Sequence, residues 1–314
     1  MFSSRSLRLL PSVRNIITSA PVGPAPVRFT SVRFTSSINP PLPPSATLVE
    51  SGRLITTTPA NALRPAPTMF SLHGLRTLPF WTSPNPPPGS PPADPSKSRV
   101  AYNDKVVSSV VAHLEKNFAL IKEEYMSAVM GVGNQGISDQ KPLSSDYDIS
   151  DSDNHASLHT GQWEWHSYVQ KGGKLNAFRE RCPKTARAID AIGKDLFTDT
   201  PFSFCFFSTL HGGAKIAPHS GSTNLRLRVH LPLIVPEDSA NVEKVGLRCG
   251  GQVRTWEEGK AVVLDDSYVH DVWNDTDGPR VVLLVDIWHP DVTDEERNSI
   301  KDMFSYAKHM DWLK

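Results

Sequence analysis

One segment, Leu225 to Leu233, constrains the fold more than any other part of the chain. Its odd-numbered residues are aliphatic, and its even-numbered residues are Arg226, Arg228, His230 and Pro232. Because a strand points alternate side chains to opposite faces, one face is aliphatic and the other carries two guanidinium groups and an imidazole. His219 precedes this strand, and another isolated histidine, His270, follows a later strand. The pattern predicts a pocket for a small anion beside a metal.

The overall composition narrows the class of protein. Lys and Arg number 33 and Asp and Glu number 33, so the formal net charge is zero and predicts no nucleic-acid partner. No apolar run approaches the roughly 20 residues of a membrane-spanning helix, so we expect no transmembrane segment. The three cysteines, Cys182, Cys205 and Cys249, are too few and too widely spaced for a disulfide framework or a cysteine metal knuckle. We interpret them as free thiols in a reducing compartment.

The first third of the chain differs from the rest. Residues 1 to 49 contain no acidic residue but five arginines among many serines and threonines, a composition typical of a mitochondrial transit peptide. We therefore assign residues 1–38 to a basic, transit-like segment and predict a mitochondrial location, with the cytoplasm as the alternative. Residues 39–98 are rich in proline, which lacks a backbone donor, so they predict an unpacked linker. We expect the folded domain to span residues 99–314.

Hydrophobic periodicity within this domain predicts short strands flanked by helices. Helical spacing of apolar residues predicts helices over 103–129 and 184–197, and Thr293 followed by Glu296 predicts the capping box of a final helix. The predicted strands cover residues 202–210, 224–235, 245–249, 261–265 and 280–288. Such a series predicts a mostly β fold with flanking helices, in which a barrel or jelly-roll core carries the site.

Two histidines are the candidate metal ligands. His219 ends a predicted loop and His270 follows the strand at 261–265, so both can converge in the mouth of a barrel. Asp265 and Asp266 offer oxygen atoms near His270 for hydrogen bonds that orient a ligand. Imidazole suits iron, zinc, copper and nickel alike, so the two histidines alone leave the metal open.

The arginines are the candidate anion-binding groups. An arginine fork binds a carboxylate through two hydrogen bonds, and a small dicarboxylate needs one such contact at each end. Arg228 with His230 can hold one end, and Arg280, at the start of an apolar strand, can hold the other. The alternative for each arginine is a surface salt bridge with one of the nearby acidic residues Asp265, Asp286 or Glu237.

Several of these segments together resemble a known family. PHSGSTNLRLRVHLPL, DDSYVHDVWN and RVVLLVDIWHP, with FSFCFFSTLHGGAKIAPH upstream, closely resemble the catalytic domain of the aspartyl/asparaginyl β-hydroxylases. The resemblance covers roughly residues 160 to 314. It implies a double-stranded β-helix, a jelly-roll or cupin-like fold, that carries an iron(II)- and 2-oxoglutarate-dependent dioxygenase.

The resemblance also assigns the metal site. It implies that His219 and His270 bind Fe(II) and that they are the catalytic centre. Most 2-oxoglutarate oxygenases add a carboxylate two residues after the first histidine. Gly221 occupies that position here, and the chain resembles the β-hydroxylase family in using two histidines and water.

The same resemblance assigns the residues that contact the cosubstrate. Arg280 and Ser208 would bind the distal carboxylate of 2-oxoglutarate, and Arg228 with His230 its C1 carboxylate. Arg226 faces the same way and is the candidate contact for a substrate carboxylate.

The implied reaction is hydroxylation of an unactivated carbon. The substrate would be of the amino-acid type, either an aspartyl or asparaginyl residue in a peptide or a free amino acid or small metabolite. Dioxygen would be consumed, and succinate and CO2 would be released. Two alternatives stay open: a non-catalytic double-stranded β-helix protein that binds a small anion, and a zinc hydrolase. The latter usually has three protein ligands, and no third is evident near the two histidines.

Overall fold

The structure, a computed structural model, describes residues 54–56, 65, 67–82, 104–132, 141–147 and 158–311. All of them belong to one compact unit, residues 40–314. The predicted transit-like segment, residues 1–38, lies outside the described residues, as does most of the predicted linker.

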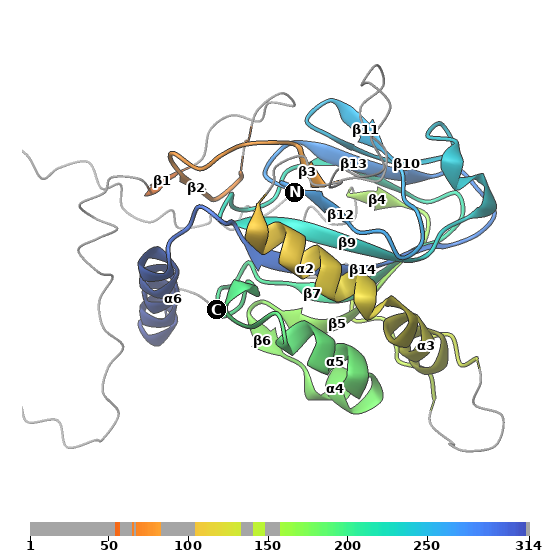
Figure 1. Ribbon diagram of the computed structural model, residues 1–314, viewed down its shortest axis with the longest axis horizontal. Coiled ribbons are helices and arrows are strands. Elements are labelled where there is room, and N and C mark those ends of the chain that lie inside the picture. Colours follow the sequence, from red (N-terminus) through yellow and green to blue (C-terminus); the bar gives the residue numbers. More distant parts are fainter. Residues whose placement is uncertain are drawn as a thin grey trace, which may run out of the picture. The chain divides into compact units, whose positions relative to one another are not determined.

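Eight consecutive strands form the core of the fold (Figure 1). They are β7 (Cys205–Leu210), β8 (Lys215–His219), β9 (Arg226–Ile234), β10 (Val245–Cys249), β11 (Gln252–Arg254), β12 (Val262–Leu264), β13 (His270–Asn274) and β14 (Arg280–Trp288). One sheet contains the order β12-β9-β14-β7, the other contains β11-β10-β13-β8, and every pairing is antiparallel. The chain changes sheet after each strand except at the β10–β11 hairpin. This topology is a double-stranded β-helix, which confirms the predicted fold class.

Further strands widen both sheets. The larger sheet gains β3 (Phe80–Thr82) beside β12, and β5 (Trp163–Gln170) with β6 (Gly173–Lys174) beyond β7. The smaller sheet gains β4 (His159–Thr160) beside β8. In the described part of the chain the sheets thus have seven and five strands, and β1 (Leu54–Thr56) pairs separately with β2 (Phe70–Leu72).

Helices cover the outer face of the seven-stranded sheet (Figure 1). They are α2 (Lys105–Lys116), α3 (Phe118–Ala128), α4 (Asn176–Arg181) and α5 (Pro183–Asp190), while α6 (Asp294–His309) follows β14. The single helix predicted over 103–129 is two helices that meet at Asn117, whose side chain donates to the carbonyl of His113. The helix predicted over 184–197 ends at Asp190 and is followed by a 3-10 turn, Gly193–Asp195. The capping box predicted at Thr293 is confirmed.

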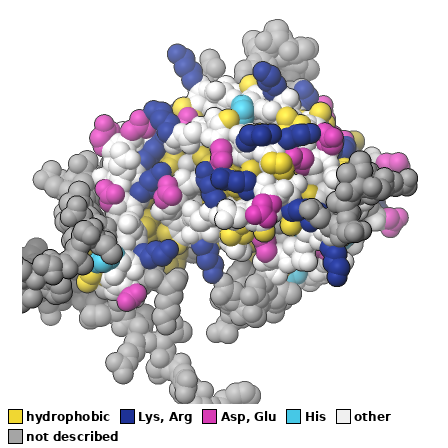
Figure 2. Space-filling view, turned by 90° about the horizontal axis from the view of Figure 1, so that it is seen from below, with side chains coloured by type: hydrophobic (Ala, Val, Ile, Leu, Met, Phe, Trp, Pro, Cys, Tyr) yellow, Lys and Arg dark blue, Asp and Glu magenta, His cyan; other side chains and the backbone are white. Residues whose placement is uncertain are grey.

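The surface mixes charges of both signs. Seen from below, Lys and Arg side chains lie interleaved with Asp and Glu (Figure 2), an arrangement typical of a solvated face. Among the described residues, the structure contains no helix that is both long enough and apolar enough to span a bilayer.

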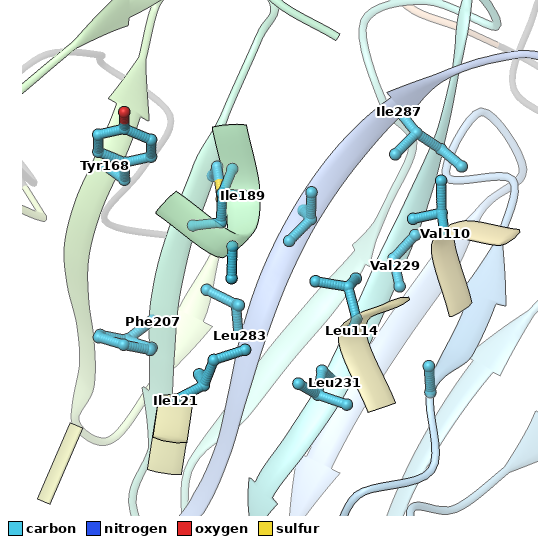
Figure 3. Close-up of a cluster of buried hydrophobic side chains, with 14 of the residues drawn as sticks. Val110, Leu114, Ile121, Tyr168, Ile189, Phe207, Val229, Leu231, Leu283 and Ile287 are labelled. Atoms are coloured by element: carbon cyan, nitrogen blue, oxygen red, sulfur yellow. The ribbon is translucent and has the colours of Figure 1, made fainter. Parts of the chain in front are cut away.

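The main hydrophobic core lies between the helices and the seven-stranded sheet (Figure 3). Leu227, Val229 and Leu231 of β9 point into it and are fully buried, next to Leu114 of α2 and Leu283 of β14. Each such side chain contributes roughly 1.5–3 kcal/mol on burial. The predicted aliphatic face of the strand is therefore confirmed, and the even-numbered residues of β9 are left to face the smaller sheet.

Residues 67–82, which we call the N-terminal strap, correct the predicted linker. This segment is packed, because Leu72 and Trp81 are no more than 1% exposed and β3 pairs with β12. The prolines of the predicted linker concentrate at residues 84–95, whereas the strap carries aromatic and aliphatic side chains that can be buried. The prediction that residues 39–98 as a whole stay unpacked is wrong for these residues.

The strap is bonded to the two segments that carry the site. Its amides at 68, 69 and 70 donate to the carbonyls of Gly221 and Ser222 at 2.9–3.0 Å. The Asn224 side chain both accepts from the amide of Leu72 and donates to its carbonyl, at 2.8 and 2.9 Å. Farther on, the amide of Asp265 donates to the carbonyl of Pro79 at 3.1 Å. The strap therefore ties the loop after His219 to the end of β12.

Candidate active site

A cavity of about 280 Å³ opens between the two sheets. All seven residues that the sequence identified line it: Ser208, His219, Arg226, Arg228, His230, His270 and Arg280. A depression of about 420 Å³ elsewhere is lined by loop residues at 212–213 and 275–277 and contains no histidine or arginine. The smaller cavity is therefore the candidate active site.

His219 and His270 form a pair on neighbouring strands. His219 is the last residue of β8 and His270 the first of β13, and the two are directly opposite in the antiparallel register. Their ring centroids lie 4.1 Å apart. The sequence predicted that they converge, which is confirmed, but it placed His219 in a loop and missed both strands.

Each ring is held in one tautomer. Nδ1 of His219 lies 2.8 Å from the carbonyl of Ala217, and Nδ1 of His270 lies 2.9 Å from the carbonyl of Tyr268. A carbonyl oxygen can only accept, so both Nδ1 atoms carry the proton and both Nε2 lone pairs are available. Burial lowers the pKa of His219, and burial together with the neighbouring His219 lowers the pKa of His270 to about 3. Both imidazoles are therefore neutral near pH 7.

This donor set fits a divalent transition metal. Neutral imidazoles whose Nδ1 donates to a backbone carbonyl are the usual form of metal-binding histidine. Within the described residues, no third His, Cys, Asp or Glu completes a ligand cluster with them. A metal held by His219 and His270 would thus keep its remaining positions for water and small-molecule ligands; the two imidazoles fit iron(II) and other divalent transition metals alike.

Asp266 fills the space beside Gly221. A Cβ atom at Gly221 would lie only 2.7 Å from Oδ2 of Asp266, and the Gly221 amide donates to the Asp266 carbonyl at 2.7 Å. A carboxylate side chain at position 221 therefore has no room unless Asp266 moves. Asp266 lines the cavity, whereas Asp265 turns away and accepts from the amide of Ser267 at 3.0 Å.

Arg226, Arg228, Asp266 and Asp286 form what we call the buried charge cluster. Arg226 contacts Asp266 at 2.6 Å and Asp286 at 3.1 Å, and it donates to the carbonyl of Phe202. Arg228 contacts Asp286 at 2.9 Å and Asp266 at 3.2 Å. The arginine side chains are only 4% and 14% exposed and the aspartates not at all. Both arginines thus form salt bridges, as the alternative predicted for Asp286, but the bridges are buried and the second partner, Asp266, was not predicted.

The cluster neutralises its own charge. Burial disfavours the charged forms of Arg228 and Asp266. Asp266 and Asp286 nevertheless raise the pKa of Arg228. In turn, Arg226 and Arg228 hold the pKa of Asp266 well below its ordinary value. Two positive and two negative groups balance each other. Neither arginine therefore depends on a bound anion for its counter-charge.

Arg280 is in the opposite situation. It is 2% exposed, and no hydrogen bond or ion pair joins its side chain to any residue that the structure describes. Burial alone lowers its pKa to about 9, so it is still charged at pH 7. Its guanidinium lies 5.0 Å from the ring centroid of Trp256, a cation–π contact that offsets part of the cost of burial. An unpaired cation in a cavity is a strong anion site.

Two neighbours complete this anion site. Trp163 Nε1 donates to the Ser208 hydroxyl oxygen at 2.9 Å, which leaves the Ser208 hydrogen free to donate to an anion. The His230 ring is stacked 6.3 Å from Trp256, and its Nδ1 has no partner among the described residues. Burial and the adjacent Arg280 lower the pKa of His230 well below its ordinary value. Trp256 was not predicted from the sequence, because it lies in a loop and a single tryptophan there does not indicate a site.

Aromatic side chains form one wall of the cavity. Trp163, Trp165, Phe204 and Phe206, the aromatic rim, all line it. Trp165 stacks on Phe206 at 4.2 Å and packs edge-on against Trp163 at 5.1 Å and Phe204 at 6.0 Å. The rim is thus a preformed apolar surface next to the histidine pair.

The chain is similar in sequence to several known proteins. The chain is 28% identical over 233 residues to mouse aspartyl/asparaginyl beta-hydroxylase, and the alignment covers 74% of this chain but 26% of the mouse protein. It is 27% identical to aspartate beta-hydroxylase domain-containing protein 2 of Xenopus tropicalis, over 82% of this chain and 58% of that protein. It is 33% identical to ornithine lipid ester-linked acyl 2-hydroxylase of Rhizobium tropici, over 57% of each chain.

Among solved structures, a Pseudomonas putida prolyl-4-hydroxylase aligns with 41% of this chain and 72% of its own, at 15% identity and a TM-score of 0.26. The family model described as aspartyl/asparaginyl beta-hydroxylase matches residues 115–290, a range that contains all seven candidate site residues. The chain belongs to the aspartyl/asparaginyl beta-hydroxylase family.

Proposed function

We propose that the protein is an iron(II)- and 2-oxoglutarate-dependent dioxygenase that hydroxylates an unactivated carbon of an amino-acid-type substrate. The observation that carries the proposal is the presence, in one cavity, of two neutral histidines with free Nε2 atoms and one buried, unpaired arginine. Bound iron would supply the activation of dioxygen, with electrons from the conversion of 2-oxoglutarate to succinate and CO2. Family membership and two relatives that are named as hydroxylases support the proposal.

The protein groups would bind and orient the reactants. His219 and His270 would hold the iron. Arg280, helped by the Ser208 hydroxyl, would take the distal carboxylate of 2-oxoglutarate, because it lines the cavity and forms no ion pair with any described residue. His230 and the partly exposed edge of Arg228 would face the C1 carboxylate. The enclosed walls would limit the access of water.

Succinate formation by the full-length protein tests this proposal. The protein would be loaded anaerobically with Fe(II) and 2-oxoglutarate and then mixed with oxygen. We expect succinate from the unaltered protein and none from the His270→Ala and Arg280→Ala variants. His309→Ala, at an exposed position of α6, is the matched control and should behave as the unaltered protein.

The same assay separates the alternatives. Binding of 2-oxoglutarate without any succinate would favour a non-catalytic protein that binds a small anion. Hydrolysis supported by zinc, without use of 2-oxoglutarate, would favour the zinc hydrolase. Absence of both metal and 2-oxoglutarate binding would contradict the assignment of the site.

We also propose that the protein is imported into mitochondria. The support is the basic, acid-free composition of residues 1–38. Amino-terminal sequencing of the protein recovered from purified mitochondria and from the cytosol tests this. We expect a shortened chain in the mitochondrial fraction, and an uncleaved chain confined to the cytosol would contradict the proposal.

A further inference from the structure

One buried residue, Trp256, contacts two groups of the anion site without lining the cavity itself. The indole is 2% exposed, and it is not among the residues that line the cavity. The guanidinium carbon of Arg280 lies 5.0 Å from its ring centroid. The His230 ring is stacked against it, with centroids 6.3 Å apart and planes 24° from parallel. Any effect of Trp256 on a ligand must therefore pass through Arg280 and His230.

The indole is the described group that fixes the direction of the Arg280 side chain. Arg228, by contrast, is held by Asp286, which accepts from its Nε and Nη2 at 2.9 and 3.0 Å. Among the residues that the structure describes, no hydrogen bond or ion pair holds Arg280 in this way. An arginine side chain has several rotatable bonds, and its planar guanidinium stacks well on an aromatic face. Before an anion binds, the rotamer of Arg280 therefore depends on Trp256.

The indole is itself held in place relative to β9. Trp256 lies in the loop between β11 and β12, and it belongs to a buried apolar cluster with Val262 of β12. The amide of Gly259 in the same loop donates to the carbonyl of Pro232 of β9 at 2.9 Å. Because His230 is on that strand, these contacts fix the indole relative to His230.

The backbone alone does not set the distance between the two anion-binding groups. His230 of β9 is opposite Leu284 of β14, and Arg280 lies four residues before Leu284. At roughly 3.4 Å per residue, the two backbone positions are about 13 Å apart along the sheet. Both side chains nevertheless reach the same indole, so the Arg280 side chain must extend along the strand toward His230. The rotamer of Arg280 therefore decides how far its guanidinium lies from the His230 ring.

We infer that Trp256 is a positioning residue that fixes the distance between the Arg280 guanidinium and His230, and that it thereby selects the length of the diacid that binds. The inference rests on the proposed function, which assigns Arg280 and His230 to the two carboxylates of 2-oxoglutarate. With the indole in place, the site favours 2-oxoglutarate over 2-oxoadipate, which has one more methylene group. Without the indole, Arg280 can withdraw into the space that the ring occupied, and the longer diacid then fits.

Binding of the two diacids to the full-length protein tests this inference without turnover. Calorimetry would measure both dissociation constants in the presence of Fe(II) and in the absence of oxygen. We expect the unaltered protein to prefer 2-oxoglutarate by about tenfold or more, because a fixed site discriminates to this extent against one extra methylene. In Trp256→Leu the affinity for 2-oxoglutarate should fall about tenfold, because the cation–π contact that holds Arg280 is lost. The affinity for 2-oxoadipate should stay the same or rise, so the preference should be nearly lost.

Further variants separate positioning from structural damage. Trp256→Met also lacks an aromatic face, but its flexible side chain adapts to the gap, so the test does not depend on the folding of a single variant. Trp256→Phe keeps a smaller aromatic face and should restore most of the preference. Trp273→Leu is the matched control, because Trp273 also has an arginine over its ring, Arg248 at 5.8 Å, but lies outside the cavity lining. It should keep the preference of the unaltered protein.

The possible results are distinct. Loss of the preference in both non-aromatic variants of Trp256, together with its retention in Trp273→Leu, would support the inference. An unchanged preference in Trp256→Leu and Trp256→Met would overturn it, even if both diacids bound more weakly, because an equal loss indicates general damage to the site. Equal binding of the two diacids by the unaltered protein would overturn it as well and leave the proposed function intact. If the unaltered protein bound neither diacid, the proposed function on which the inference rests would itself be contradicted.

Discussion

Replacing Arg280 with methionine separates stability from ligand binding at this site. The guanidinium is buried and has no carboxylate partner among the described residues, so the folded protein carries the cost of an uncompensated charge. Methionine is flexible and apolar, and it can fill the space over the Trp256 ring. We expect Arg280→Met to be more stable than the unaltered protein without ligand and unable to bind 2-oxoglutarate.

The magnitude follows from the pKa of Arg280. Burial lowers it from its ordinary value to about 9. Each factor of ten in proton affinity is worth about 1.4 kcal/mol, so the charged form costs about 5 kcal/mol. The contact with Trp256 returns about 1–2 kcal/mol of this. Imperfect packing of the new side chain costs about 1 kcal/mol more. The expected net gain is about 2–3 kcal/mol, or about 4–12 °C in melting temperature for a domain of this size.

The sign of the effect depends on pH. The folded-state pKa lies below the unfolded-state value, and at pH 7 the guanidinium is charged in both states. The penalty is therefore fully present at pH 7 and is relieved only as the pH rises from about 9 toward the ordinary pKa of an arginine. The gain from the substitution should be largest at neutral pH.

Thermal unfolding with and without 2-oxoglutarate is the assay. Ligand at 100 times its dissociation constant should stabilise the unaltered protein by about 2.7 kcal/mol and Arg280→Met not at all. Arg254→Met is the control, because Arg254 is also buried but donates to the carbonyl of Val253 and lies outside the cavity. It should keep the ligand effect. An Arg280→Met protein that is less stable than the unaltered one, or still stabilised by ligand, would refute the reasoning.

Three further predictions concern the same site. The affinity of the unaltered protein for 2-oxoglutarate should fall as the pH rises through about 9, where Arg280 loses its proton; calorimetry that shows constant affinity up to pH 10 would contradict this. Gly221→Ala should lower the free energy of unfolding by about 1–3 kcal/mol, because the new Cβ would lie 2.7 Å from Asp266. An unchanged midpoint of urea unfolding would contradict this prediction. Asp266→Asn should retain less iron after gel filtration than Asp265→Asn, because only Asp266 lines the cavity, and equal retention would count against a role for Asp266.

Local periodicity accounts for what the sequence could predict. The alternation along β9 sets which side chains enter the core and which face the cavity, because the period of a strand is fixed by its backbone. The same pattern placed Arg226, Arg228 and His230 on one face, and the structure agrees. The spacing of His219 and His270 did not identify the pair by itself; the residues around them and the resemblance to the family did.

Long-range register accounts for what the sequence could not predict. Asp286 contacts Arg228 because β14 pairs with β9 in one particular register, and the two residues are 58 positions apart. Nothing in either segment alone distinguishes Arg228, which is paired, from Arg280, which is not. The strands β8 (KIAPH) and β13 (HDVWN) were missed because their apolar residues are adjacent and do not alternate, and because β8 contains a proline.

The N-terminal strap has a consequence for how this family is delimited. The family match begins at residue 115 and contains both histidines, yet residues 67–82 bond to Gly221, Ser222 and Asp265, the neighbours of His219 and Asp266. A fragment cut to the family match would keep every diagnostic residue and lose the backbone contacts that hold two of its segments together. In this chain, the stretch of sequence that identifies the family is therefore shorter than the stretch whose backbone contacts the segments of the site.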